Sequence, residues 1–187
     1  MIERTLLLVK PDGVQRALIG KVVSQIEDAG LKIVAMKMVW PDKKIAGIHY
    51  ADDPAWYQAT GSKTLQNYKE RGMKTNKTAE QLARWVRDML IEFISGGPVV
   101  AMVVEGESAI FVTRKMVGST EPRKADPSTI RGRYSPDSYD ISNVKERPLL
   151  NIAHASEDTK TAEREIAVWF RKSEIMSYKR AGEDIIA

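Results

Sequence analysis

The sequence predicts an α+β fold: a four-stranded antiparallel sheet with helices packed on one face, in the order βαββαβ, plus a helical insertion before the third strand. Strand-like and helix-like segments alternate along the chain, and four segments have the pattern of a strand. A small parallel sheet is the alternative, and it would ordinarily carry a glycine-rich turn after its first strand. Here that turn is Pro11-Asp12-Gly13, so the antiparallel sheet is favoured.

The first half of the chain supplies two strands and two helices. Residues 5–9 are a continuous apolar run, typical of a buried strand. Residues 19–29 have apolar side chains at helical spacing, and Gly30 follows where a helix commonly ends. Residues 31–40 are rich in β-formers and alternate in part, which predicts a second strand. Residues 43–50 are expected to form a short helix.

The second half supplies the remaining elements. Residues 78–94 carry an apolar stripe at helical spacing, and a glycine-proline break separates this helix from a strand over 99–104. A helix is expected over 107–117. A short apolar strand then ends at His154, and a helix over 160–170 completes the core.

Two segments interrupt this order. Residues 54–77 mix Gly, Thr, Asn and Lys, and residues 119–148 contain four prolines. Loops of this length in a small domain are usually functional or disordered. The total of 187 residues nevertheless fits one domain with insertions.

Composition narrows the class of protein. A hydrophobic fraction of 43% is enough for a packed core, and a net charge of +4 suits phosphate-bearing ligands without indicating a specific nucleic-acid partner. The longest apolar stretch, residues 98–104, is too short to span a bilayer, and the first residues show no signal-peptide pattern. The absence of cysteine excludes disulfides and thiol catalysis. We therefore expect a cytoplasmic protein without membrane association.

His154 is the first candidate for chemistry. It is one of only two histidines and lies at an expected strand–helix junction. Imidazole titrates near neutral pH and can attack as a neutral nucleophile. A lone histidine beside apolar residues is more often structural, so other residues have to support this assignment. Side chains suited to binding phosphate occur in separate segments: Lys10, Arg114, Thr120, Arg131 and Asn151.

Five motifs resemble those of the nucleoside diphosphate kinase family, and the match spans residues 3 to about 178. Ala155 stands where the family usually has glycine. In chain order, the motifs contain Lys10-Pro11-Asp12-Gly13, Gly97-Pro98-Val99-Val100-Ala101-Met102, Thr129-Ile130-Arg131-Gly132, Asn151-Ile152-Ala153-His154-Ala155-Ser156 and Ala162-Glu163-Arg164-Glu165-Ile166.

The resemblance implies a ferredoxin-like core and a ping-pong reaction. The γ-phosphate of a nucleoside triphosphate, mainly ATP, moves through a phosphohistidine to a nucleoside diphosphate, with Mg²⁺, in support of NTP synthesis. It implies that His154 is the nucleophile and that Glu165 orients its ring. Ser156 would assist, although a helix N-cap is an equally good role for it. Mg²⁺ is carried by the phosphates, so no protein metal site is expected. The implied nucleotide contacts are Lys10, Tyr50, Leu90, Arg114, Thr120, Arg131 and Asn151.

The chain departs from the family pattern in two places. We expect a single domain over residues 1–187 with insertions at about 54–85 and 134–148. The first interrupts a helical hairpin that in the family carries an aromatic for base stacking. Trp56 is preferred for this role and Trp85 is the alternative; stacking accepts every base, so broad nucleoside acceptance is expected. The second alters a loop that in the family helps to form subunit contacts. The resemblance implies a homo-oligomer, with hexamers commonest and tetramers and dimers known.

Other classes of protein are less consistent with the sequence. A nucleic-acid-binding module of the same fold class would stack bases on aromatics of its central strands, but residues 5–9 and 99–104 contain none. A regulatory phosphohistidine protein would need His154 but not the nucleotide contacts. A catalytically silent relative would not keep every contact position filled. The second histidine, His49, is interpreted as a partly buried helix residue.

Overall fold

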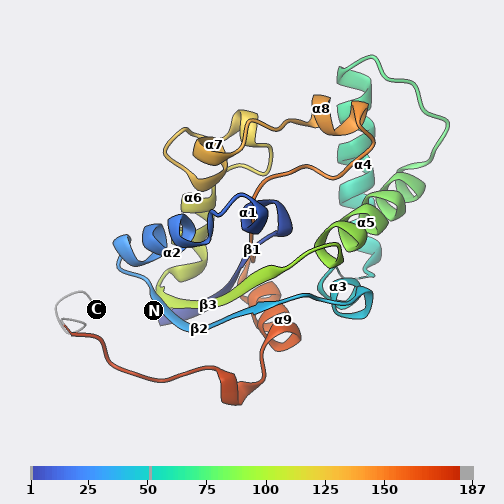
Figure 1. Cartoon of the computed structure of the whole chain (residues 1–187). Helices are drawn as coiled ribbons and strands as arrows, with labels where there is room; N and C mark the ends of the chain where they lie inside the picture. Colours follow the sequence, from blue (N-terminus) through green and yellow to red (C-terminus); the bar gives the residue numbers. More distant parts are fainter. Residues whose placement is uncertain (1, 51, 182–187) are drawn as a thin grey trace.

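The computed structural model describes residues 2–50 and 52–181. One antiparallel sheet, in the order β2-β3-β1-β4, lies at its centre (Figure 1). The strands are β1 (Ile2–Val9), β2 (Lys32–Val39), β3 (Val99–Glu107) and β4 (Ala153–Ala155). The helices are α1 (Pro11–Gln15), α2 (Ile19–Asp28), α3 (Lys43–His49), α4 (Pro54–Glu70), α5 (Ala79–Ser95), α6 (Ala109–Val117), η1 (Pro122–Lys124), α7 (Ile130–Tyr134), α8 (Tyr139–Val144), α9 (Thr159–Trp169) and η2 (Lys172–Glu174). The antiparallel α+β prediction is confirmed.

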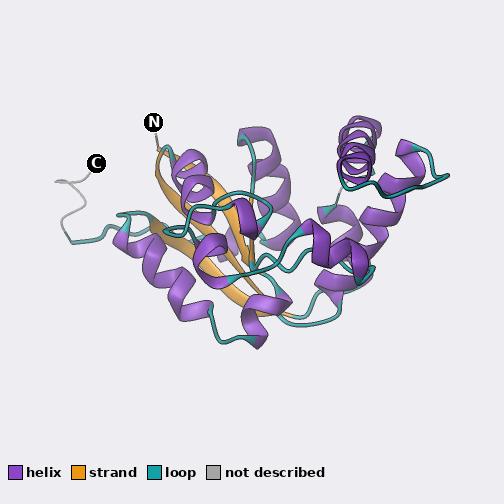
Figure 2. Cartoon of the chain, turned by 90° about the horizontal axis from the view of Figure 1, so that it is seen from above, coloured by secondary structure: helices purple, strands orange, loops and turns teal. Residues whose placement is uncertain are grey.

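Helices cover both faces of the sheet, so the prediction that they pack on one face is wrong. Leu7 and Val9 of β1 pack in a cluster with side chains of α2 and α6, whereas Leu6 and Leu8 pack with Trp169 of α9 on the other face. Figures 1 and 2 show the helices on either side of the strands. Because both faces are buried, β1 is apolar at successive positions instead of alternating with polar residues.

The helical insertion is a hairpin of α4 and α5, which projects from one end of the sheet (Figure 2). The capping pattern around Thr78 marks the start of α5, where Thr78 and Gln81 each accept the other's backbone N–H. Helix α4 occupies most of the segment that has no clear apolar period. It is capped by Asp53, and only Tyr57 and Gly61 within it are buried, so it has no broad apolar stripe.

The long segment after α6 is ordered by short helices with polar caps. Thr129 caps α7 by accepting the Gly132 N–H, and Ser138 caps α8 by accepting the Ile141 N–H. This segment runs from the end of α6 back to β4, and it therefore lies beside the strand that carries His154. None of the helices within residues 2–50 and 52–181 has the length and apolar character needed to cross a bilayer.

Candidate active site

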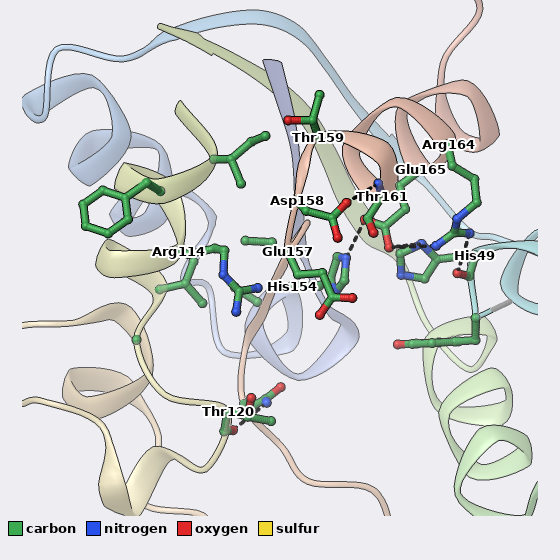
Figure 3. Close-up of a pocket in the computed structure, with 18 of the residues that line it drawn as sticks. His49, Arg114, Thr120, His154, Glu157, Asp158, Thr159, Thr161, Arg164 and Glu165 are labelled. Carbon is green, nitrogen blue, oxygen red and sulfur yellow. Dashed lines mark hydrogen bonds and ion pairs between the residues drawn. The ribbon is translucent and has the colours of Figure 1, made fainter. Parts of the chain in front are cut away.

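An open cleft of about 1650 Å³ lies beside edge strand β4. Ser156 is fully buried and lies outside the lining of this cleft. The other predicted site residues all line it: Lys10, Tyr50, Trp56, Leu90, Arg114, Thr120, Arg131, Asn151, His154 and Glu165. Figure 3 shows Arg114 and Thr120 on one side of His154, with Glu165 and His49 on the other.

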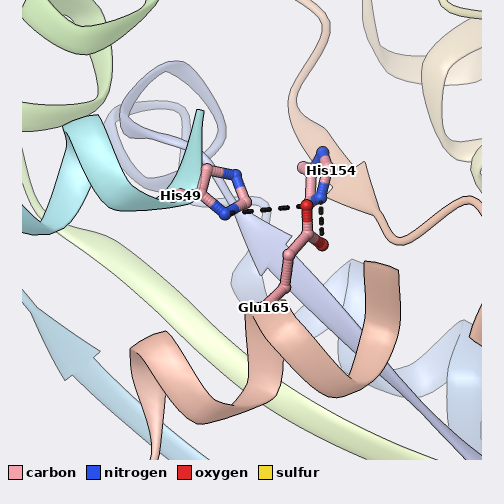
Figure 4. A group of neighbouring side chains, drawn as sticks. All are labelled: His49, His154 and Glu165. Atoms are coloured by element: carbon pink, nitrogen blue, oxygen red, sulfur yellow. Dashed lines mark hydrogen bonds and ion pairs between the residues drawn. The ribbon is translucent and has the colours of Figure 1, made fainter. Parts of the chain in front are cut away.

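His154 is held by a carboxylate from the following helix. Its Nε2 lies 2.8 Å from Glu165 Oε2, and Ser156 Oγ donates to the same oxygen at 2.7 Å. Burial opposes ionisation of Glu165, but the bonds from His154 and Ser156 and the nearby imidazoles lower its pKa to about 2. An ionised carboxylate only accepts hydrogen bonds, so His154 Nε2 carries the proton. The other ring nitrogen, Nδ1, then has a free lone pair and points away from Glu165 (Figure 4).

Ser156 does not cap α9. The N-cap is Asp158, whose carboxylate accepts the Thr161 N–H at 2.7 Å. The N-cap alternative for Ser156 is therefore wrong, and its hydroxyl is used to hold Glu165 instead. Glu165 faces β4 because it lies two helical turns inside α9, on the buried side of the helix.

His49 belongs to the site, contrary to the interpretation of a partly buried helix residue. It is fully buried at the end of α3, and its ring lies edge-on to that of His154 with centroids 4.7 Å apart. Trp169 Nε1 donates to His49 Nδ1 at 3.3 Å, so the His49 proton is on Nε2. Burial, and the charge that His154 carries when it is protonated, lower the pKa of His49 to about 3. Its approach of 3.8 Å to Glu165 is thus a contact of a neutral ring, not an ion pair.

Asp12 is a second residue that the sequence analysis did not assign to the site. Its Oδ2 accepts the Ile152 N–H at 2.9 Å, while the Lys10 N–H donates to Ile152 O at 2.7 Å. Ile152 has a φ of 69°, which is strained for a β-branched residue. Gly13 permits this close approach, because a Cβ there would lie 3.0 Å from Ile152 O. The turn after β1 thus clamps the backbone two residues before His154.

Lys10 and Asn151 join β1 to the segment after α6. Lys10 Nζ donates to Asn151 Oδ1, and Asn151 Nδ2 donates to Thr120 O at 2.8 Å. Burial lowers the pKa of Lys10 to about 8, against the raising effect of Asp12. Lys10 is therefore a cation held at a fixed place beside His154, and it loses its charge unusually easily for a lysine.

Arg131 supports the backbone around the cleft while contributing positive charge. Its guanidinium donates to Gly118 O and Ala153 O at 2.8 Å and to Asn151 O at 3.3 Å. Burial and the charge of Arg114 lower its pKa to about 10, so it stays charged at neutral pH. Together with Lys10, these two arginines place three cations in the cleft, a set of side chains suited to phosphate. The lining also holds acidic side chains, among them Glu157 and Asp158 near His154 (Figure 3).

The hairpin supplies the apolar side of the cleft. Trp56 from α4 and Leu90 from α5 line it, whereas Trp85 does not and instead carries Lys77 over its ring. Tyr50 lines the cleft beside His49, and burial and the charges of Glu165 and Asp12 raise its pKa, which keeps the phenol protonated.

Among the described residues, one cluster has the spacing of a metal site: His49, His154 and Glu165, whose ligand atoms lie within 4.8 Å of one another. Its donors are two imidazoles and a carboxylate oxygen pair that already contacts His154, Ser156 and His49. Mg²⁺ prefers a shell of oxygens. Two imidazoles and one carboxylate do not supply that shell, so this cluster does not fit Mg²⁺.

The sequence and the fold of this chain are similar to those of one family of known proteins. The family model described as nucleoside diphosphate kinase matches residues 3–58 and 57–175. A nucleoside diphosphate kinase of Pyrobaculum aerophilum is 40% identical over 181 residues, covering 94% of this chain and 98% of its own. The crystal structure of an NDP kinase from that organism superposes with a TM-score of 0.92 at 38% identity, covering 95% of this chain and all of the other. A transition-state mimic of the Borrelia burgdorferi enzyme, with bound vanadate and ADP, has a TM-score of 0.81 at 40% identity and covers 99% of this chain and 96% of its own.

Proposed function

Because this chain belongs to the nucleoside diphosphate kinase family, whose reaction is phosphoryl transfer between nucleotides, we propose that His154 is the group that carries the phosphoryl in transit. One observation supports this most: the hydrogen bond at 2.8 Å between His154 Nε2 and an ionised Glu165. It holds the ring in the tautomer whose Nδ1 has a lone pair, in a cleft that Lys10, Arg114 and Arg131 also line.

In the first half-reaction, the Nδ1 lone pair attacks the γ-phosphorus of the nucleoside triphosphate. The N–P bond forms as the bond from phosphorus to the β,γ-bridging oxygen breaks, and the diphosphate leaves with that electron pair. The Nε2–H stays on the ring, and Glu165 stabilises the positive charge that develops there. In the second half-reaction, a terminal oxygen of another diphosphate attacks the same phosphorus, and the N–P bond breaks. No general base is needed.

Three cations in the cleft stabilise the transferred group, and the fold fixes two of them, Lys10 and Arg131, by hydrogen bonds. Lys10, Arg114 and Arg131 line the cleft beside His154, and Thr120 and Asn151 add polar groups. Phosphoryl transfer depends mainly on positioning and charge stabilisation, so this set fits the reaction. The Mg²⁺ expected for the reaction would be brought by the phosphates, where it neutralises their charge. The structure of the Borrelia burgdorferi enzyme is a transition-state mimic with bound vanadate and ADP, which supports nucleotide binding by this chain.

We also propose that the chain is a single domain with two insertions and acts as a homo-oligomer. Edge strand β2 leaves Met36, Met38 and the following Trp40 exposed, at 55%, 58% and 70%. The C-terminal segment covers only part of this edge, where Met176 N donates to Val34 O at 2.8 Å. Exposed apolar side chains at alternate positions of an edge strand favour contact with a second copy. Light scattering distinguishes a monomer from a dimer, tetramer or the expected hexamer. The cytoplasmic location stays a prediction.

The reaction is tested by following the phosphoryl group. Incubation with γ-labelled ATP should label the protein in an acid-labile, base-stable form, and added GDP should remove that label as GTP. His154→Ala should abolish labelling while leaving the circular dichroism spectrum unchanged. Transfer to GDP without any labelled protein would contradict the two-step proposal. Stable labelling that GDP cannot remove would instead favour a regulatory phosphohistidine protein.

A further inference from the structure

Two walls of the cleft come from segments far apart in the chain. The α4–α5 hairpin provides Trp56 and Leu90, the apolar wall. The segment after α6 provides Thr120 and Arg131, part of the cationic wall. A nucleotide that spans both walls needs a fixed distance between them, since base and phosphates are joined by one ribose.

The hairpin is a unit anchored at one end. Arg87 of α5 donates to Tyr50 O at 2.7 Å and to Gly47 O at 2.8 Å, which ties the hairpin to α3. Gly61 allows α4 to pack directly on the start of α5, because a Cβ there would clash with the Ala79 backbone. The far end of α4 reaches past the cleft toward α8, and Figure 1 shows these two helices side by side.

Arg71, the C-cap residue of α4, bridges the two walls. Its Nε donates to Asp140 of α8, its Nη2 lies 3.7 Å from Glu121 Oε1, and its guanidinium lies over the Tyr139 ring at 5.9 Å. The Arg71 side chain is only 18% exposed and that of Glu121 only 4%. Asp140 is half-exposed, but the arginine and Glu121 are largely removed from water. One arginine that contacts two carboxylates and an aromatic face is held more firmly than in a single exposed ion pair.

The bridge leads directly to the predicted phosphate contacts. Glu121 follows Thr120, whose carbonyl accepts the Asn151 amide, and Asn151 in turn accepts from Lys10. Glu121 Oε1 also accepts the Tyr139 N–H at 3.0 Å, so α8 and Thr120 are held together. A shift of α4 relative to α8 would therefore change the position of Thr120.

We propose that Arg71 is a positioning residue for nucleotide binding. It sets the distance between the apolar wall and the phosphate wall, although it does not line the cleft itself. The inference rests on the proposed function, because it concerns the same cleft. Since Arg71 has no contact with His154 or Glu165, it acts on nucleotide affinity and leaves the chemical step at saturating nucleotide unchanged.

The test compares Arg71→Ala with Arg123→Ala. Arg123 pairs with the same Asp140, at 3.1 Å, but lies in η1 on the phosphate side, so its loss does not separate the walls. ADP affinity is measured by calorimetry, and labelling from saturating γ-labelled ATP is measured in parallel. Arg71→Ala should bind ADP roughly tenfold more weakly, as expected when a charge-assisted contact is lost, and should raise KM with kcat unchanged. Arg123→Ala should match the unmodified protein in both.

Asp140→Ala provides a second variant in case Arg71→Ala fails to fold, because its half-exposed side chain is the main partner of Arg71. Asp140→Ala should also weaken ADP binding. The double variant should lose less binding free energy than the two single variants lose together, because both remove the same contact. Equal ADP affinity in Arg71→Ala and Arg123→Ala, or a fall in kcat without a change in KM, would overturn the inference. Absence of label in the unmodified protein would reject the proposed function, and the ADP comparison would still decide the role of Arg71.

Discussion

The Glu165 carboxylate approaches the His154 ring at Nε2, with 2.8 Å between oxygen and nitrogen. This single contact assigns different tasks to the two ring nitrogens. Nε2 carries the proton and faces a negative charge, and Nδ1 keeps the lone pair that the proposed function needs in a nucleophile. Ser156 Oγ donates to the same carboxylate oxygen at 2.7 Å, so the orientation of the ring depends on three residues of one strand–helix unit.

Glu165→Gln should lower the rate of phosphohistidine formation by roughly 10²- to 10⁴-fold. The amide oxygen can still accept from Nε2, but it no longer offsets the positive charge that develops on the ring. Nucleotide affinity should change little, because Glu165 is not among the cations and donors proposed to bind phosphate. Single-turnover labelling and ADP calorimetry separate the two quantities, and an unchanged labelling rate would remove Glu165 from the proposed catalytic set.

Lys10 should give the reaction a basic limb. Burial lowers its pKa to about 8, so the free protein loses this cation as the pH rises through that value. kcat/KM for the nucleotide, which reports on the free protein, should fall between about pH 7 and 9. Lys10→Gln should have a lower kcat/KM at every pH, and this value should not fall between about pH 7 and 9. If the variant keeps the same basic limb, another group is responsible.

His49 should make the fold sensitive to mild acid. Its pKa is about 3 in the folded protein against an ordinary value of 6.5, so below 6.5 only the unfolded chain takes up the proton. The free energy of unfolding should then fall by up to about 1.4 kcal/mol per pH unit as the pH drops below that value. His49→Gln should flatten this part of the curve when urea unfolding is measured between about pH 7 and 5. This range lies above 4.5, the ordinary pKa of Glu165, so that carboxylate contributes little there. Equal slopes would mean that His49 is protonated in the fold.

Trp56 and Trp85 should differ in their effect on nucleotide affinity. Trp56 lines the cleft and Trp85 does not. Trp56→Ala should therefore weaken the binding of ADP, GDP, CDP and UDP alike. The expected loss is roughly tenfold, the scale of one lost stacking contact. Trp85→Ala is the matched control and should leave all four unchanged. The four diphosphates should also be accepted within roughly a hundredfold of one another, the range that apolar contacts discriminate. Competition at equal concentration measures this, and exclusive use of one base would contradict it.

The elements with strong local signals could be predicted from the sequence. The apolar run of β1, the stripe of α5 and the glycine after α2 each have a local physical cause, and the site residues were found through motifs that surround them. Helix α4 has no such signal in its periodicity, because it rests on α5 with only Tyr57 and Gly61 buried. The second helical face of the sheet was missed because the pattern of α9 indicates an amphipathic helix without indicating which side of the sheet it covers.

The places of His49 and Asp12 in the site could not be predicted from the sequence. A histidine at the end of a short helix has no local feature that places it beside His154, since their contact joins residues 105 positions apart in the chain. Being one of two histidines, and next to Tyr50, was the available signal. Asp12 appeared only as part of a turn, because its bond to Ile152 depends on the pairing of β1 with β4. The Arg71 bridge depends in the same way on long-range contacts.

The central claim, that His154 Nδ1 accepts the phosphoryl group, is tested most directly by locating the phosphate on the ring. The protein is phosphorylated with ATP, the nucleotide is removed, and ¹⁵N and ³¹P resonances are recorded at alkaline pH, where phosphohistidine persists. The account predicts one phosphate for each chain, bonded to Nδ1 of His154 and lost on addition of GDP. A phosphate on Nε2, which Glu165 occupies, or on any other residue would contradict it.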